Sequence, residues 1–449
     1  MITMITSLRT ILKQVLRALI LMVTCSAIVE AQGTNVQVQL VTLFDSNGPI
    51  GPEAGLVQDS SGAFYGTTKF GGPYFDTGSV FKITPDGVVD TLVFFDNYAF
   101  YPVTGLTQIS NGLFVGTTEG TIFKIDSMGD FSNVFTLNYD TNGTQPMGDL
   151  LFSKDGNLYG STYYSGSGNG TLFKMTLSGG FTTLVNFDYT NGGGPNGRLL
   201  EADDGCLYGE TSRGGSNGWG TIFKYDGSAG LATLYSFTDG DDGSYPSGGL
   251  IQTTNGDFYG VTASGGQFGE GTVFQFRTNA GLTTLISFDG TNGSYPQARL
   301  IQGSDGAFYG TTLAGAAFNA GTVFRIDAFG NLTTLGVFDG TNANASYAGL
   351  IMAQDGNLYG TTSGGGFHDS GTVFRLVTPP SVTVVNSAGQ STTLTWNSFP
   401  GAHYRVDGTS SVNSTWAPFT NFISAGAYTS LAITHSGLEQ FYRVVLLPW

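Results

Sequence analysis

Aromatic and charged residues gather in a few short stretches of this sequence, and together they could bind a sugar. The stretches contain Tyr74 and Asp76, Tyr164, Arg213 and Trp219, Phe268 and Glu270, and Phe367, His368 and Asp369. Aromatic rings stack on the apolar C–H faces of sugars, and carboxylates accept hydrogen bonds from hydroxyl groups. The sequence therefore predicts a binding site for a glycan or a protein here, although the same aromatic rings could equally pack within their own loops.

Acidic residues in the same kind of stretch could instead do chemistry. Asp76, Glu119, Glu270 and Asp369 could supply the carboxylate pair of a glycosidase or lyase. Nothing in the sequence brings two of them together, and the three histidines are scattered. The sequence also contains no metal-spaced His/Cys cluster, nucleophile elbow or phosphate-binding loop. We predict a non-catalytic protein, with a carbohydrate-active enzyme as the alternative.

Three Asp-rich and Asn-rich turns could bind calcium. They are TDGDDGS (238–244), DGTNGS (289–294) and DGTNAN (339–344). Their clustered oxygen atoms suit a hard cation, but Asx turns explain the same residues without a metal. We predict no cofactor and leave calcium open.

A repeat of about 50 residues positions all of these stretches. The glycine that follows FY, LY or FV recurs at Gly66, Gly116, Gly160, Gly209, Gly260, Gly310 and Gly360. The phenylalanine of GTVF and its variants recurs at Phe81, Phe123, Phe173, Phe223, Phe274, Phe324 and Phe374. Two anchors that share one period are typical of propeller blades or solenoid repeats.

Each repeat divides into four strand-like runs without helical periodicity. In the sixth repeat the runs are 299–303, 307–312, 321–326 and 331–339. Ser-Gly, Asn-Gly or Asp-Gly follows the first run in every copy, as tight hairpins require. Four antiparallel strands per unit predict a β-propeller blade. We expect the repeated Phe and Tyr in the core, and the repeated basic position, such as Lys174 or Arg325, paired with nearby acids.

The two ends of the array predict how the ring closes. The seventh repeat has no fourth strand, because Pro379-Pro380 follows GTVFRL. The segment 36–45 has the sequence of a fourth strand and precedes the first complete set. We therefore predict an all-β fold whose main domain is a seven-bladed β-propeller over 36–377, closed by the N-terminal strand. The second-to-third and fourth-to-first loops then share one face, called the long-loop face below, and it carries the aromatic and charged stretches.

The repeat unit resembles a known family. Its pattern, clearest in LIMAQDGNLYGTTSGGGFHDSGTVFRL (350–376), is similar to the GloVer tandem repeat of secreted bacterial proteins with varied C-terminal surface anchors. The resemblance covers about three quarters of the chain. It implies export and a propeller-like array, and it implies no particular activity. The ending FYRVVLLPW has neither an apolar span nor a basic tail, which departs from the anchored pattern.

The segment 381–449 predicts a small second domain. Its half-buried strand patterns, TTLTW (392–396), HYRVD (403–407), YTSLAIT (428–434) and QFYRVVLL (440–447), resemble a fibronectin type III-like or immunoglobulin-like β-sandwich with Trp396 in its core.

The remaining features concern location and partners. Residues 1–31 have a basic start, a short apolar run and small residues at a cleavage site, which predicts a secretory signal peptide. Beyond it the only cysteine is Cys206, so no internal disulfide is expected. The 17 Lys and Arg against 33 Asp and Glu give a net charge of −16, which disfavours nucleic acid. We expect a monomer that is secreted or held at the cell surface, with no membrane span in the mature chain.

Overall fold

The computed structural model describes most of the chain between residues 37 and 446. The described residues are 37–44, 48–72, 77–84, 87–95, 101–102, 104–165, 168–303, 305–327, 329–366, 368–377, 382–388, 391–397, 403–409, 417–423, 428–434 and 441–446. The predicted signal peptide lies outside them. Contacts divide the chain into two compact units, one formed by residues 37–353 and 358–376 and the other containing 377–449.

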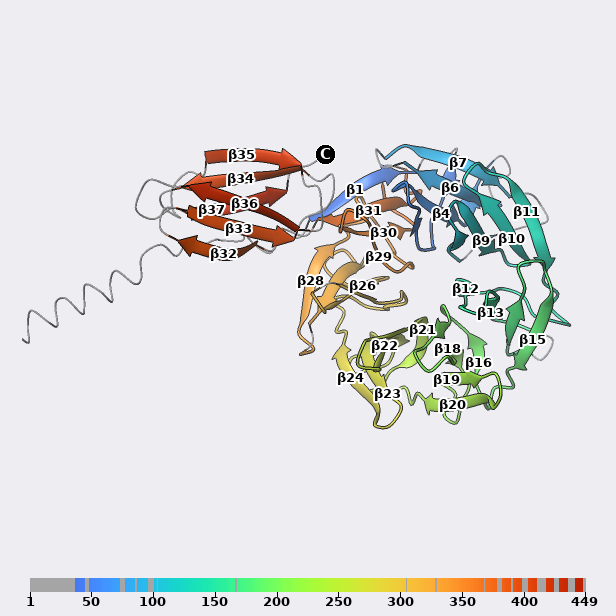
Figure 1. Ribbon diagram of the computed structural model, residues 1–449. Helices are drawn as coiled ribbons and strands as arrows, with labels where there is room; N and C mark the ends of the chain where they lie inside the picture. Colours follow the sequence, from blue (N-terminus) through green and yellow to red (C-terminus); the bar gives the residue numbers. More distant parts are fainter. Residues whose placement is uncertain are drawn as a thin grey trace, which may run out of the picture. The chain divides into compact units, whose positions relative to one another are not determined.

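The first unit is a seven-bladed β-propeller (Figure 1). Six blades follow one another along the chain. The first blade contains β3 (Val57–Gln58), β4 (Phe64–Thr68), β6 (Ser79–Ile83) and β7 (Val89–Phe94), and the second contains β8 (Thr107–Ser110), β9 (Leu113–Thr117), β10 (Thr121–Asp126) and β11 (Phe131–Thr136). The third contains β12 (Leu151–Phe152), β13 (Leu158–Thr162), β14 (Thr171–Met175) and β15 (Phe181–Asn186), and the fourth contains β16 (Gly193–Pro195), β17 (Leu200–Glu201), β18 (Leu207–Arg213), β19 (Thr221–Asp226) and β20 (Gly230–Ser236). The fifth contains β21 (Ser244–Gln252), β22 (Phe258–Ser264), β23 (Thr272–Arg277) and β24 (Gly281–Ser287), and the sixth contains β25 (Ile301–Gln302), β26 (Phe308–Thr312), β27 (Thr322–Ile326) and β28 (Leu332–Val337).

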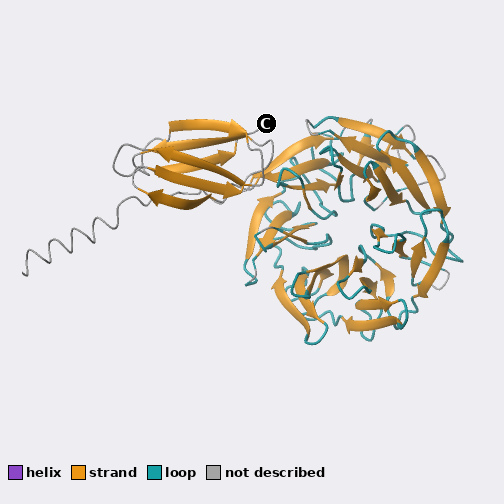
Figure 2. Cartoon of the chain, in the orientation of Figure 1, coloured by secondary structure: helices purple, strands orange, loops and turns teal. Residues whose placement is uncertain are grey.

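The seventh sheet has the order β1-β31-β30-β29. It contains β1 (Gln37–Leu43), β29 (Ile351–Met352), β30 (Leu358–Thr362) and β31 (Thr372–Val377). The Phe44 amide after β1 donates a hydrogen bond of 3.3 Å to the Gly371 carbonyl before β31. A small separate pair, β2 (Pro49–Ile50) and β5 (Phe70–Gly71), lies near the first blade. Strands and loops make up the whole described chain, without a helix (Figure 2).

The two repeat anchors are physically coupled within each blade. Gly310 in β26 is the cross-strand partner of Phe324 in β27. A Cβ at Gly310 would lie only 2.5 Å from the Phe324 ring, and the same distance recurs at all seven anchor glycines. The absence of a side chain therefore lets the ring lie across the neighbouring strand. Phe324 is fully buried and packs edge-on against Phe288, with ring centroids 5.2 Å apart. The predicted core position of the repeated Phe is confirmed.

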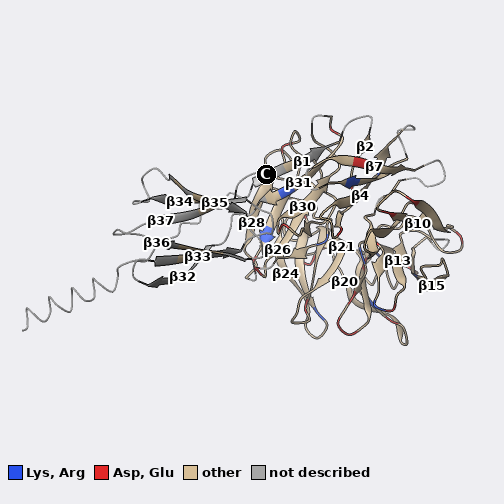
Figure 3. Cartoon of the chain, turned by 45° about the horizontal axis from the view of Figure 1, so that its top comes forward, with Lys and Arg blue, Asp and Glu red and all other residues tan. Residues whose placement is uncertain are grey.

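In three blades the repeated basic residue pairs with an acid, as predicted. There the hairpin Asp accepts a hydrogen bond from the Tyr of its own blade and forms an ion pair with the basic residue of the strand beyond. The ion pairs are Lys174–Asp155 at 2.9 Å, Lys224–Asp204 at 2.8 Å and Arg325–Asp305 at 2.7 Å. These charges have a structural role in the outer half of the blades. Charged residues are sparse along the described propeller strands (Figure 3).

A threonine after the anchor glycine ties three of the blades to the next one. Thr67 donates to the Thr104 carbonyl at 2.8 Å, Thr311 to the Ala348 carbonyl at 3.2 Å and Thr361 to the Ala54 carbonyl at 2.9 Å. In the fourth blade this position is Glu210. An ionised carboxylate only accepts hydrogen bonds, so Glu210 cannot replace the threonine as a donor.

The second unit consists of two three-stranded antiparallel sheets. One has the order β32 (Val382–Ala388), β33 (Ser391–Asn397), β36 (Tyr428–Thr434), and the other β35 (Ala417–Ile423), β34 (His403–Thr409), β37 (Phe441–Leu446). Leu394, Val406 and Val444 are buried. The side chain of Trp396 lies outside what the structure describes. No helix long and apolar enough to cross a membrane is found in the described residues.

Candidate functional site

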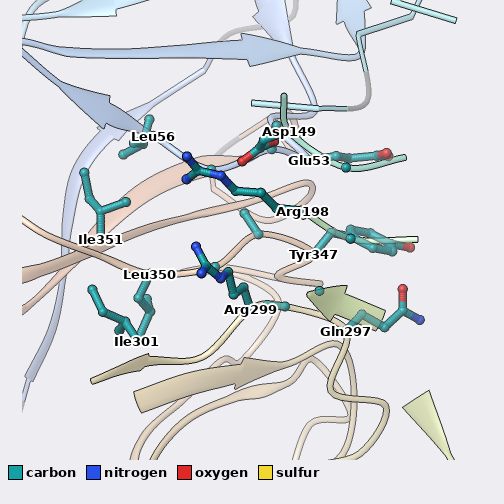
Figure 4. A pocket seen from close by; sticks show the side chains of 18 of the residues that line it. Glu53, Leu56, Asp149, Arg198, Gln297, Arg299, Ile301, Tyr347, Leu350 and Ile351 are labelled. Atoms are coloured by element: carbon teal, nitrogen blue, oxygen red, sulfur yellow. The ribbon is translucent and has the colours of Figure 1, made fainter. Parts of the chain in front are cut away.

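A pocket lies at the centre of the propeller, where the innermost segments of all seven blades meet (Figure 4). Its volume is about 780 Å³. Its walls are residues 53–57, 106–108, 147–149, 196–198, 247–248, 297–301 and 347–352, with Lys69 beside them. This volume is within the usual range of ligand sites, roughly 300–1,000 Å³.

The repeat explains how side chains reach this pocket. Every innermost segment contains a buried leucine, for example Leu300 or Leu350. Neighbouring residues of a strand-like segment face opposite ways, so the residue immediately before the leucine points away from it, towards the axis. The residue immediately before the leucine is Gly55, Gly105, Asp149, Arg198, Gly249, Arg299 and Gly349 in the seven blades. Three blades thus place a charged side chain where the other four have none.

The two arginines are the main charged groups of the pocket. The Arg198 guanidinium forms no hydrogen bond or ion pair with any described residue. Arg299 donates one hydrogen bond, from Nε to the Leu250 carbonyl at 3.1 Å. Figure 4 shows both guanidinium groups extending into the pocket, with the Asp149 carboxylate beside Arg198.

The acids of the pocket are already engaged. Asp149 Oδ1 accepts a hydrogen bond of 2.6 Å from the Gly105 amide. Glu53 forms an ion pair with Lys69, with Nζ–Oε2 at 3.1 Å. Among the 17 Lys and Arg of the chain, three (Lys69, Arg198 and Arg299) line this one pocket. With two acids against them, the pocket is positively charged in a strongly negative protein.

Burial lowers the pKa of Arg299, but the guanidinium group stays charged at neutral pH. Burial and the nearby Arg198 lower the pKa of Arg299 to about 10, against the opposing attraction of Asp149 and Glu210. The side chain therefore stays charged at neutral pH, in an environment that disfavours the charge. An anion bound between the guanidinium groups would relieve that cost.

Glu210 in β18 lies buried near Arg299. Its Oε2 accepts a hydrogen bond of 3.1 Å from the Gly249 amide, so it ties the fourth blade to the fifth as an acceptor. Its Oε1 is buried without a hydrogen-bond partner. Burial raises the pKa of Glu210 well above its usual value, although the Gly249 amide and Arg299 act in the opposite direction. Glu210 is thus a buried hydrogen-bond acceptor beside Arg299, in surroundings that disfavour its ionised form.

Three of the ten residues predicted as a binding site, Tyr74, Asp76 and Phe367, are outside the described residues. The described ones lie in or next to the long loops of the blades, called the rim below. None of the other seven lines the pocket. The fourth-to-first loops do lie against the second-to-third loops of the preceding blades, as the Tyr245 amide donates to the Trp219 carbonyl at 3.0 Å and the Tyr295 amide to the Glu270 carbonyl at 2.9 Å.

The structure brings some of these rim residues together. The Arg213 guanidinium stacks 5.1 Å from the Tyr163 ring and 5.4 Å from the Tyr164 ring, and it donates to the Gly168 carbonyl. Trp219 packs edge-on against Tyr245, with centroids 5.4 Å apart. These contacts join the loops of neighbouring blades, which fits the interpretation that the aromatic rings pack among the loops.

Other rim residues lie at the surface. Phe268 is 55% exposed. His368 is exposed, and Asp369 Oδ1 accepts a hydrogen bond of 2.6 Å from the Gly365 amide. Glu119, Glu270 and Asp369 belong to three different blades.

The Asp side chains of the Asp-rich turns accept hydrogen bonds from backbone amides of the same turn. Asp289 Oδ1 accepts hydrogen bonds from the Thr291 and Asn292 amides, and Asp339 repeats the pattern with Thr341 and Asn342. These are Asx turns, which explain the similar sequences of the two turns without a metal. Within the described residues no group of three or more His, Cys, Asp or Glu could hold a metal ion.

Comparison with known proteins identifies the repeat and the fold. A sequence model described as the Gloeobacter/Verrucomicrobia repeat matches residues 118–255 and 199–411. No curated protein matches the chain. A streptogramin B lyase structure is similar with 14% identity and a TM-score of 0.55, covering 78% of this chain and 99% of that one.

Two further solved structures have the same fold. The extracellular domain of a putative hybrid two-component system from B. thetaiotaomicron is 12% identical, with a TM-score of 0.54, and the match covers 82% of this chain and 45% of that one. The extracellular domain of a putative one-component system from the same organism is 12% identical, with a TM-score of 0.51, and covers 92% and 58%. At these identities the likeness establishes the propeller fold alone.

Proposed function

We propose a function from two premises: this chain belongs to the Gloeobacter/Verrucomicrobia repeat family, and its central pocket holds two arginines that lack acidic ion-pair partners. The protein is a secreted, non-catalytic recognition protein whose pocket binds an anionic group of an extracellular glycan or protein. The observation that carries this proposal is the unpartnered Arg198 guanidinium beside the half-buried Arg299.

Guanidinium groups suit this role because of their shape. Each presents several N–H donors in a planar fork that matches a carboxylate, sulfate or phosphate. Arg198 has all of its donors available, and Arg299 has its two terminal nitrogens available. A structural arginine would instead be expected to pair with an acid, as Arg325 does with Asp305.

The wider organisation that we propose follows from the sequence. Residues 1–31 are a signal peptide, and β1 closes the ring at the seventh blade. The segment 381–449 is a fibronectin type III-like sandwich. The Phe44–Gly371 hydrogen bond and the two three-stranded sheets support the last two inferences. The fold shared with two bacterial extracellular domains supports export.

Binding accounts for the site better than catalysis does. The loop acids of the glycosidase or lyase alternative lie in separate blades, and the two acids of the pocket are engaged by Lys69 and by the Gly105 amide.

The proposal is tested with small anions on the full chain. Thermal unfolding is followed in sulfate, phosphate and citrate, with sodium chloride at matched ionic strength as the reference. A ligand at ten times its Kd stabilises a protein by about 1.4 kcal/mol, so at least one of the anions should raise the melting temperature measurably.

The variants locate the effect. The Arg198→Gln, Arg299→Gln double variant should lose the stabilisation, while Arg277→Gln, a surface arginine paired with Asp257, should keep it. The proposal is wrong if no anion stabilises the protein more than chloride does, or if the double variant responds like the wild type.

A further inference from the structure

The central pocket is also lined by polar and aromatic side chains that a simple anion would not need. Asn196, Gln297 and Tyr347 line the pocket, each two residues before Arg198, Arg299 and Gly349 respectively. The chain enters each of these segments from a fourth-to-first loop, so the three residues come from the side of the pocket nearer the long-loop face. Among the described residues none of the three side chains has a hydrogen-bond partner, and Tyr347 is 39% exposed.

From this arrangement, and resting on the anion site proposed above, we infer that the ligand is a sugar acid, bound as one residue of an acidic polysaccharide. Its carboxylate lies against Arg198 and Arg299. Its hydroxyl groups lie against Asn196 and Gln297, and its ring lies against Tyr347.

The chemistry of the rim favours hydroxyl groups. A carboxamide offers both donors and an acceptor, and a sugar hydroxyl also does both, so the two are complementary. A sulfate only accepts hydrogen bonds near neutral pH, so it would leave the carboxamide oxygens of Asn196 and Gln297 without a role. The Tyr347 ring offers an apolar face with a polar edge, which suits the C–H face of a sugar.

The charge of the pocket favours a monoanion. Lys69, Arg198 and Arg299 face Glu53 and Asp149, which leaves a net charge of +1. A carboxylate neutralises this charge, whereas a dianion would leave the pocket with a net charge of −1 and should bind more weakly. The wall also contains Val57, Ile301 and Ile351, whose apolar side chains offer nothing to a second anionic group.

The experiment uses isothermal titration calorimetry on the full chain. The ligands are the trimers of galacturonic, glucuronic and mannuronic acid, their methyl esters, maltotriose, sulfate and phosphate. We expect at least one acidic trimer to bind at least tenfold more tightly than its ester, than maltotriose and than either inorganic anion.

Tyr347→Ala should weaken binding of that trimer at least fivefold. Tyr139→Ala, which removes a tyrosine that is 47% exposed and lies outside the pocket, should leave binding unchanged. The Arg198→Gln, Arg299→Gln variant should abolish binding.

The outcomes separate this inference from the proposed function. If sulfate or phosphate binds as tightly as the acidic trimers, loses affinity in the double variant and ignores Tyr347→Ala, the anion site is correct and the sugar-acid inference is wrong. If maltotriose or the esters match the acidic trimers, the sugar-acid inference is also wrong. If no anion, trimeric or inorganic, binds in an arginine-dependent way, both proposals are wrong.

Discussion

Replacing Arg299 by Met should make the unliganded protein more stable, because the fold holds this charge at a cost. The pKa of Arg299 is lowered to about 10 from the ordinary value of arginine. At about 1.4 kcal/mol per pH unit, this difference amounts to roughly 3 kcal/mol. Both the folded and the unfolded chain are protonated at neutral pH, so the whole penalty is present there, and it is relieved only as the pH rises above about 10.

Two effects reduce the expected gain. The Arg299 side chain is partly exposed, so water screens some of the penalty. Met also removes the hydrogen bond to the Leu250 carbonyl, at a cost of about 1 kcal/mol. We therefore expect Arg299→Met to raise the free energy of unfolding by about 1–2 kcal/mol.

Urea unfolding at pH 7, followed by intrinsic fluorescence, measures this change. Arg277→Met is the matched control, because it removes an exposed arginine paired with Asp257, and it should lower stability by less than about 1 kcal/mol. If Arg299→Met is less stable than the wild type by more than the control is, Arg299 holds the fold together and is not a ligand-binding group.

The other predictions concern the anchor glycines and Glu210. Gly310→Ala should lower the free energy of unfolding by about 1–3 kcal/mol, because its Cβ would lie 2.5 Å from the Phe324 ring. The control Gly227→Ala should change the free energy of unfolding little, because a Cβ there would have no atom within 4 Å. Equal urea midpoints for the two variants would contradict the packing argument. Because the pKa of Glu210 is raised in the folded protein, folding retains a proton that the unfolded carboxyl has released, and the wild type should lose stability relative to Glu210→Gln as the pH rises from 5 to 8. Unfolding free energies measured at both pH values should show this gap moving in that direction; a constant gap would mean that Glu210 is ionised in the fold.

The fold could be predicted from the sequence because the residues that recur in the repeat are those that pack against one another within each blade. Gly310 and Phe324 recur together since each exists to accommodate the other across two paired strands. The hairpin Asp305 recurs since it caps its own turn and pairs with Arg325. Strand lengths were less accessible: the run predicted at 299–303 is a ladder of only Ile301–Gln302, because the preceding residues line the pocket instead of pairing.

The central pocket was not predicted from the sequence, for a physical reason. Aromatic residues in loops, such as Trp219, suggest a binding site, but here they pack against neighbouring loop residues. Arg198 and Arg299 lie inside strand-like runs, where they look like ordinary strand positions. The available signal was their departure from glycine at an aligned position, and its meaning depends on knowing that this position faces the axis.

The most direct test of the anion site is crystallographic. Crystals of the full chain are soaked in selenate, whose selenium atom is located by anomalous diffraction. We predict a peak in the central pocket within hydrogen-bonding distance of both the Arg198 and the Arg299 guanidinium groups, and no such peak in the double Gln variant. Selenate bound elsewhere on the protein, with the central pocket empty, would contradict the account.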